Sequence, residues 1–465
     1  MTVPEKEHKE GGGVAAMDVN EAPTAVAAGG GGEGQDFTKM SVVDTMKLYY
    51  GWLYPHDVMY KWLVYGNDSK HPHADGSYFN RREFCFTLDG DIFVRYQSFA
   101  NGEDLKSAIK ARCPAKIDIG PVYNVDPQKR AAYAAGNTFA PVERELVFDI
   151  DITDYDDVRT CGKDAHICTT CWPLMATAID VLDDALRNDF GFQHVFFVFS
   201  GRRGVHAWVC DEKARKLPDE ARAAIAQYLS VYKGLEKGLP KLTTGIESHP
   251  FISRTYDVLA KVFESKVLPG QKLLEDEEQT RSILQMIPES VREVAVSEWK
   301  KLNNNEDQGD VSVARWKVIQ ECLKKECARY AKANPRDVRT VKLMEKSVRD
   351  VVFAYTYPRL DIEVSKKMNH LLKAPFCVHP KTGKVCVPID PKEAWSFNPD
   401  TVCTVGQLLN ELNSSEAGDA NQSYMNTGMG GAVKTFETCF LNSLLRENKE
   451  VLASRVREQG AHVSW

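Results

Sequence analysis

The stretch Glu145–Asp157, ELVFDIDITDYDD, sets the fold class that the sequence predicts for this chain. Three apolar residues run directly into Asp149-Ile150-Asp151, as in a β-strand that leaves a hydrophobic core. Successive side chains of a strand point to opposite faces, so Asp149 and Asp151 lie on the same face. Paired carboxylates repel each other unless a cation lies between them, and oxygen ligands suit Mg²⁺ or Mn²⁺. The structural alternative is a strand that ends in solvent with ordinary surface acids.

A third acid extends this pattern. The sequence YPRLDIEVS at 357–365 has strand-like character and places Asp361 after an apolar residue. Three aspartates at strand ends, separated by long insertions, suit a two-metal site that transfers a phosphoryl or nucleotidyl group. One ion would activate the attacking hydroxyl and the other would stabilise the leaving pyrophosphate. Taken alone, Asp361 would be a surface acid.

A basic loop follows the apolar strand predicted at 194–200. The loop reads SGRRGVHAWVCD, Ser200–Asp211, and its Ser-Gly turn presents Arg202, Arg203 and His206. Guanidinium groups bind phosphate oxygens in bidentate fashion, and a tight turn can expose backbone N–H groups to the same anion. A β-hairpin whose arginines face water is the alternative. The chain contains no G-x-x-x-x-G-K-[ST] sequence, which excludes a P-loop nucleotidase.

A second basic cluster, SKKMNHLLKAPFCVHPKTG, spans Ser365–Gly383. His370 and Lys373 would share a face if this piece is helical. Lys373, His379 and Lys366 could then converge on the phosphates that the arginine loop holds. A solvated helix and turn is the alternative.

The sequence CGKDAHICTTC at 161–171 predicts a metal site. Cys161, His166, Cys168 and Cys171 give four ligands for tetrahedral zinc, and a site without an open position is structural rather than catalytic. The other cysteines, of 12 in all, are scattered, and the N-terminus lacks a signal-peptide pattern. Both features favour a reducing compartment, the cytosol or nucleus, where clustered cysteines bind metals rather than form disulfides.

The composition describes a soluble globular protein. The chain has 465 residues, of which 43% are hydrophobic and 27% charged, enough for an ample core. No apolar run reaches the roughly 18 residues of a membrane helix, so no membrane partner is expected. The net charge of −6 gives no global basic field, although a local basic groove remains compatible with it.

The predicted elements divide the chain into β-rich and helical parts. Strands are expected at 83–88, 91–99, 145–151, 194–200 and 384–390, and an amphipathic helix at 172–190. The expected order is a disordered Gly/Ala-rich tail at 1–36, a first core part at 37–211, a helical subdomain at 212–355, a second core part at 356–411, and a linker with a terminal helix at 412–465. The core is therefore α+β and discontinuous in sequence. The terminal helix carries an apolar face, which suits either a core helix or a partner-docking helix.

These motifs, together with REFCFTLDGDIFVRYQSF at 82–99, resemble the catalytic small subunit of eukaryotic DNA primase. The resemblance runs from about residue 40 to about residue 410, and the motifs keep their order. It implies an α+β fold with a discontinuous mixed α/β primase-type core, a zinc-binding motif and an inserted helical subdomain. It also implies synthesis of short RNA primers de novo from ribonucleoside triphosphates on a single-stranded DNA template, with Mg²⁺ or Mn²⁺ on Asp149, Asp151 and Asp361.

The resemblance also assigns nucleotide-binding and catalytic positions. Glu83 aligns with a catalytic acid, and Arg95 and Asp118 align with residues near the nucleotide. Asp118 would lie at the ribose 2′-hydroxyl, which distinguishes RNA precursors from DNA precursors. Composition alone gives these three residues no special role. The nucleotide-binding motifs fall on Ser200, Gly201, Arg202, Arg203, Gly204, Val205, His206, His370, Leu371, Leu372, Lys373 and His379.

The family often has adjacent cysteines where this chain has Cys161-Gly162, so His166 would have to replace one zinc ligand. The resemblance further implies a heterodimer with a large iron–sulfur subunit, bound to the DNA polymerase alpha complex, and a nuclear location. Two other functions stay open from the sequence. One is a primase-like repair polymerase that extends existing ends and accepts deoxynucleotides. The other is an inactive, zinc-stabilised nucleic-acid-binding module.

Overall fold

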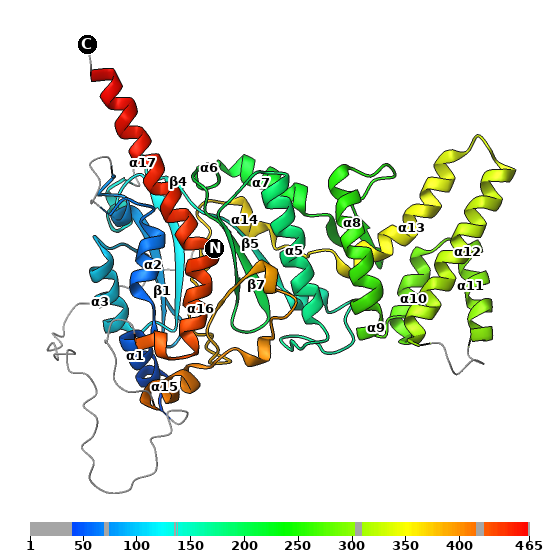
Figure 1. Ribbon diagram of the computed structural model, residues 1–465, viewed down its shortest axis with the longest axis horizontal. Coiled ribbons are helices and arrows are strands. Elements are labelled where there is room, and N and C mark those ends of the chain that lie inside the picture. Colours follow the sequence, from blue (N-terminus) through cyan, green and yellow to red (C-terminus); the bar gives the residue numbers. More distant parts are fainter. Residues whose placement is uncertain are drawn as a thin grey trace, which may run out of the picture.

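The computed structural model describes residues 40–68, 74–133, 136, 138–302, 309–414 and 423–463. The predicted tail at 1–36 lies outside the described residues. Within the described part of the chain, no helix is both long and apolar enough to cross a membrane. Figure 1 shows two β-sheets packed among helices at one end of the molecule and a group of long helices at the other end.

The first of these sheets carries the stretch quoted above. Its four strands are antiparallel and lie in the order β11-β6-β7-β5. Their bounds are β5 (Leu146–Asp151), β6 (Val195–Phe199), β7 (Gly204–Val209) and β11 (Pro388–Ile389). Phe148 and Ile150 pack in the same core cluster as the buried side of helix α5 (Trp172–Asn188). The strand alternation then places Asp149 and Asp151 on the opposite face, as predicted.

A buried charge cluster fixes the start of β5. Glu145 is fully buried, and its carboxylate lies 3.0 Å from Arg82 Nη2 and 2.8 Å from Arg144 Nη1. Burial alone would raise the pKa of Glu145, but Arg82 and Arg144 hold it well below its ordinary value. Because Arg82 begins strand β1 (Arg82–Leu88), this cluster ties the two sheets together.

The second sheet has the path β10-β3-β1-β2, and β4 also pairs with β3. Its bounds besides β1 are β2 (Ile92–Gln97), β3 (Lys116–Tyr123), β4 (Pro141–Glu143) and β10 (Leu372–Lys373). Strand β10 comes from the second basic segment and pairs with β3 through Leu372–Ile119 and Lys373–Asp118. The two parts of the core that lie far apart in sequence therefore share one sheet.

Helices from both ends of the chain cover this half of the molecule. They are α1 (Val42–Leu48), η2 (Tyr49–Leu53), α2 (His56–Leu63), α3 (Gly102–Arg112), α15 (Val405–Ser414), α16 (Gly428–Phe436), η11 (Glu437–Leu441) and α17 (Asn442–Val463). The ring centroid of Trp62 lies 5.1 Å from the ring centroid of Phe196 and 5.8 Å from that of Phe436. Phe440, Leu444 and Leu452 are also buried, so the C-terminal segment is packed against the core as far as the middle of α17.

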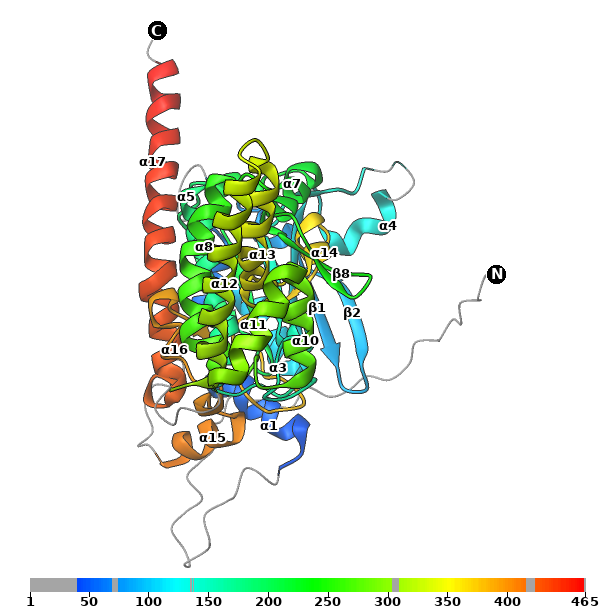
Figure 2. The same ribbon diagram turned by 90° about the vertical axis from the view of Figure 1, so that its right-hand side faces the viewer.

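The region predicted as helical contains a hairpin as well as helices. It starts with α6 (Glu212–Arg215), α7 (Asp219–Leu229) and the antiparallel hairpin β8 (Tyr232–Glu236) and β9 (Leu239–Leu242). The long helices follow as α8 (Pro250–Val262), η7 (Phe263–Val267), α9 (Leu268–Gly270), α10 (Glu277–Met286), α11 (Glu289–Leu302), α12 (Val311–Ala333) and α13 (Val338–Thr356). Figure 2 looks onto α10–α13 from the end at which they project.

Two local predictions are wrong. Residues 357–365 do not form a strand, because Asp361 accepts a hydrogen bond from the Glu363 N–H at 3.1 Å and caps helix α14 (Ile362–Lys366). His370 and Lys373 do not share a helix, because the chain is extended there and enters β10. The strands predicted at 83–88, 91–99, 145–151 and 194–200 and the helix at 172–190 are confirmed, with bounds that shift by one or two residues. Of the strand predicted at 384–390, only the two residues of β11 form a strand.

Candidate active site and metal centre

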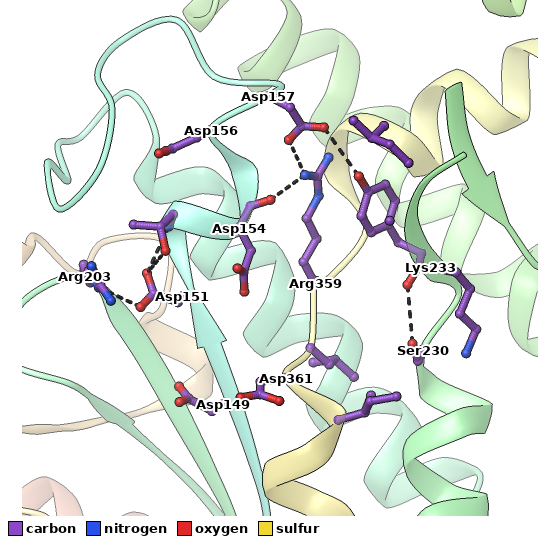
Figure 3. A pocket seen from close by; sticks show the side chains of 16 residues that line it. Asp149, Asp151, Asp154, Asp156, Asp157, Arg203, Ser230, Lys233, Arg359 and Asp361 are labelled. Atoms are coloured by element: carbon purple, nitrogen blue, oxygen red, sulfur yellow. Dashed lines mark hydrogen bonds and ion pairs between the residues drawn. The ribbon is translucent and has the colours of Figure 1, made fainter. Parts of the chain in front are cut away.

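The three predicted aspartates come together in one cavity of about 840 Å³. Asp149 and Asp151 enter it from β5, and Asp361 enters from the N-cap of α14. The Asp361 N–H donates to the Asp149 carbonyl oxygen at 3.1 Å, which holds the two chain segments together. Figure 3 shows Asp149 and Asp361 side by side and Asp151 next to Arg203.

The electrostatics of the three carboxylates favour a cation. Burial, followed by the charges of Asp151 and Asp361, raises the pKa of Asp149 to about 7. Arg203 Nε lies 2.7 Å from the Asp151 carboxylate and neutralises part of this charge. In the described part of the chain, oxygens of the three carboxylates do not all lie within 4.8 Å of one another, so one ion shared by all three would require side-chain rotations. The donor set suits hard divalent cations.

Glycines shape the turn that carries the arginines. Gly201 has a φ of +82°, and a Cβ there would lie 2.9 Å from His379 Cβ. A Cβ on Gly204 would lie 2.3 Å from the Ile150 carbonyl oxygen. Ser200 Oγ accepts a hydrogen bond from the Gly204 N–H at 3.0 Å. The turn therefore packs tightly against β5 on one side and the second basic segment on the other.

The two basic segments converge, as predicted. Lys373 Nζ donates to the Ser200 carbonyl oxygen at 2.5 Å, and Thr382 Oγ1 donates to the Gly201 carbonyl oxygen at 2.7 Å. Burial and then the charges of Lys373, Arg202 and Arg203 lower the pKa of His379 to about 4. The resulting positive potential suits an anion. Lys366 does not join this group, because it pairs with Glu363 at 2.6 Å.

His206 lies between the acids and the basic segments. Burial and the charge of Lys373 lower its pKa to about 3, so the imidazole is neutral. Its Nε2 is 3.5 Å from an Asp149 carboxylate oxygen, and its buried Nδ1 has no hydrogen-bond partner among the described residues. A buried ring nitrogen without a partner indicates a ligand that supplies one. The Val205 and Leu372 side chains instead pack in the core, so only their main chains could reach a nucleotide.

Three residues assigned by resemblance alone lie on the second sheet. Asp118 is buried and pairs with Lys116 Nζ at 2.9 Å, and its backbone pairs with that of Lys373. Glu83 is fully buried and accepts from Arg95 Nε at 3.0 Å, and it accepts from Tyr123 Oη at 3.1 Å. This geometry supports a positioning role for Glu83 toward Arg95.

Comparisons with known proteins agree with this geometry. The family model described as DNA primase small subunit matches residues 148–391. The chain is 40% identical over 392 residues to the DNA primase small subunit of Schizosaccharomyces pombe, covering 83% of this chain and 81% of that protein. The identity to the Drosophila melanogaster subunit is 38% over 426 residues, or 87% and 92% of the two chains. The Caenorhabditis elegans subunit is 35% identical over 389 residues, or 81% and 89%.

This chain belongs to the DNA primase small subunit family. Its relatives imply a nucleotidyltransferase-type polymerase with a role in DNA replication. Primase chemistry uses divalent metal, which agrees with the carboxylate donor set described above.

The primase cysteine cluster has the spacing of a zinc site. The sulfurs of Cys161, Cys168 and Cys171 all lie within 4.8 Å of one another. Cys168 Sγ and Cys171 Sγ are 3.7 Å apart, close to the tetrahedron edge of about 3.8 Å that Zn–S bonds of about 2.3 Å give. His166 is not part of this group. Its ring lies against Gly162, where a Cβ would be 2.3 Å from His166 Cδ2.

Sequence patterns missed several residues that shape the primase site. Arg359 lies two residues before Asp361. It donates a hydrogen bond to the Asp154 carbonyl oxygen at 2.5 Å and forms an ion pair with Asp157. The guanidinium carbon of Arg359 lies 4.0 Å from the ring centroid of Tyr232. The signal in the sequence was that Arg359 stands two residues before Asp361, since Asp154, Asp157 and Tyr232 lie far away in the sequence.

Proposed function

We propose that this chain synthesises short RNA primers de novo on single-stranded DNA, from ribonucleoside triphosphates. The observation that carries the proposal is the convergence of three aspartates and two basic segments around β5 and β7. Acids on one side suit divalent cations, and cations on the other suit a triphosphate. Family membership supports the same activity.

In the proposed mechanism, the chain positions the reactants rather than forming covalent bonds with them. Arg202, Arg203 and Lys373 would hold the triphosphate, and the neutral His206 would donate a hydrogen bond to it. Bound to Asp149, Asp151 and Asp361, two Mg²⁺ or Mn²⁺ ions would activate the primer 3′-hydroxyl and stabilise the leaving pyrophosphate.

The remaining nucleotide-binding positions have proposed roles on the second sheet. Asp118 would bond the ribose 2′-hydroxyl, because it lies beside the backbone of the triphosphate-binding Lys373. Arg95, held by Glu83, would contact the nucleotide from β2. These contacts favour ribonucleotides over deoxynucleotides.

We also propose a structural zinc on Cys161, Cys168 and Cys171, with His166 as fourth ligand after a rotation of its side chain. The proposed organisation keeps a catalytic core from 37–211 and 356–411 around the region 212–355, with terminal segments at 1–36 and 412–465. Family membership supports a heterodimer with an iron–sulfur large subunit, attachment to the DNA polymerase alpha complex, and a nuclear location.

A primer-synthesis assay tests the main proposal. The purified chain, with and without a large subunit, receives single-stranded DNA, Mg²⁺ or Mn²⁺ and labelled ribonucleotides. We expect RNA oligomers from the parent and none from the Asp149→Ala, Asp151→Ala double variant. Asp257→Ala, at an exposed position of α8, is the matched control. Products that form only with a supplied primer or with deoxynucleotides would indicate a repair polymerase instead. The absence of any product would indicate the inactive nucleic-acid-binding module.

A further inference from the structure

Two buried glutamines of the helical region contact the loop 156–171, which carries the three cysteines. Gln271 is 1% exposed and follows α9, and Gln279 is 7% exposed and lies on α10. Both come from more than a hundred residues further along the chain than the loop that they touch. We refer to these two residues as the glutamine pair.

Both the oxygen and the nitrogen of the Gln271 side-chain amide form hydrogen bonds with this loop. Its Oε1 accepts from the Thr160 N–H at 2.7 Å and from the Cys161 N–H at 3.2 Å. Its Nε2 donates to Cys161 Sγ at 3.4 Å and to the Thr170 carbonyl oxygen at 3.2 Å. The Gln271 carbonyl oxygen also accepts from Thr160 Oγ1 at 2.6 Å. The amide therefore fixes both ends of the cysteine loop and contacts one of its sulfurs.

Gln279 binds the start of the same loop, just before the residues that Gln271 contacts. Its Nε2 donates to the Asp157 carbonyl oxygen at 2.8 Å, and its Oε1 accepts from Tyr355 Oη on α13 at 3.0 Å. The Asp157 carboxylate pairs with Arg359, next to the catalytic acids. The loop thus connects the cysteine cluster, the helical region and the carboxylate cavity.

A buried N–H donor to a metal-bound sulfur has a specific consequence. Three thiolates on one Zn²⁺ carry excess negative charge, and hydrogen bonds from neighbouring groups stabilise that charge and orient the ligand. The amide oxygen of Gln271 accepts from main-chain N–H groups, and its NH₂ group can donate two hydrogen bonds. One of these two donated bonds goes to the Thr170 carbonyl oxygen and the other to Cys161 Sγ, so the amide is aimed at one of the three sulfurs.

We propose that Gln271 is a positioning residue of the cysteine metal site, and that it makes docking of the helical region dependent on the bound metal. Metal on the cysteines fixes the loop to which the glutamine pair binds. By thermodynamic reciprocity, a docked helical region then raises the affinity of the cysteines for the metal. This role rests on the zinc site proposed above, but not on primer synthesis.

Metal release from the full-length chain tests the first part. The metal content of the purified chain is measured first, and zinc transfer to a chromogenic chelator is then followed over time. Gln271→Glu keeps the acceptor for Thr160 and Cys161 but loses both amide donors and adds a negative charge. We expect this variant and Gln271→Ala to lose zinc about 10- to 100-fold faster than the parent. Gln320→Ala is the control, because Gln320 lies on α12 and donates to Glu264 at 2.8 Å, away from the loop.

Amide hydrogen exchange tests the second part. Removing zinc from the parent should speed exchange in 263–286, and Gln271→Glu should show the faster exchange with zinc still bound. Two results would overturn the proposal. One is a rate of zinc release from Gln271→Glu that lies within twofold of the rate of the parent. The other is protection of the amide hydrogens of 263–286 that persists after zinc is removed. If Gln271→Ala fails to fold, the zinc release and hydrogen exchange of Gln271→Glu still test the proposal. If the purified parent contains no zinc, the proposed zinc site itself is wrong. This result differs from a parent that contains zinc and a Gln271 variant that keeps it, which would overturn only the role of Gln271.

Discussion

The main-chain N–H of Asp361 donates to the main-chain oxygen of Asp149 at 3.1 Å, so two aspartates from distant parts of the sequence are fixed by backbone rather than by side chains. Their carboxylates stay available for a ligand. The geometry of the acidic site therefore depends on how α14 begins, and the capping hydrogen bond from the Glu363 N–H to the Asp361 side chain sets that start.

Asp361→Asn should abolish primer synthesis without unfolding the chain. Asparagine caps helices as well as aspartate does, so α14 keeps its start, but one negative ligand for the metals is lost. We expect at least a roughly 100-fold loss of activity and an unchanged melting temperature. Asp361→Ala loses the cap as well and should also melt earlier. Equal activity of the parent and Asp361→Asn would remove Asp361 from the metal site.

Metal affinity should depend on pH through Asp149, whose pKa is raised to about 7 from 3.8. The native chain binds more protons at this residue than the unfolded chain between these values, so the free energy of unfolding of the metal-free chain falls as the pH rises through this window. Metal binding requires the ionised form, so the affinity for Mn²⁺ should be about tenfold higher at pH 8 than at pH 6. Titration calorimetry measures this, and Asp149→Asn should remove the contribution of this residue.

The residues that local patterns predicted share a physical reason. Asp149 and Asp151 follow from the two-residue period of a strand, and the turn at Ser200 follows from its glycines. Both features are set by the nearest neighbours in the chain. Helix α5 was likewise visible, because its apolar residues repeat with the helical period over its whole length.

The features that the sequence did not predict depend on distant partners. LDIEV alternates apolar and acidic residues like a strand, but Asp361 caps a helix at this point. Strand β10 is two residues long and forms only because β3 lies next to it. Arg359 contacts Asp154 and Asp157, and Gln271 contacts Thr160, across more than a hundred positions of the sequence. No local pattern specifies such contacts.

Gly204→Ala should destabilise the whole chain. The added Cβ would lie 2.3 Å from the Ile150 carbonyl oxygen, and relief requires β5 and β7 to separate. We expect a loss of about 1–3 kcal/mol in the free energy of unfolding, measured by denaturant titration. Gly431→Ala in α16 is the matched control, since a Cβ there meets nothing within 4 Å, and a helix favours alanine. Equal stability of both variants would contradict the close approach of β7 to β5 at Gly204.

Glu83 and Arg95 should act as one unit. Glu83 Oε1 accepts from Arg95 Nε at 3.0 Å, so Glu83→Gln and Arg95→Ala break the same ion pair. Each should raise the KM for ribonucleotides more than it lowers kcat, and the double variant should be no worse than the more damaging single one. Gln97→Ala on the same strand is the control. Additive losses would show that Glu83 acts independently, as a catalytic acid would.

His166 and Cys171 should differ in their effect on zinc. Cys171 is fully buried and its sulfur lies in the cluster, so Cys171→Ser should remove most of the bound zinc. His166→Ala should also lower the zinc content, because the ring is proposed to turn toward the sulfurs when metal binds, but it should lower it less, because three thiolates remain. Metal analysis of the purified variants measures the two effects. Full zinc content in His166→Ala would show that water or another group completes the site, whereas loss equal to that of Cys171→Ser would establish His166 as the fourth ligand.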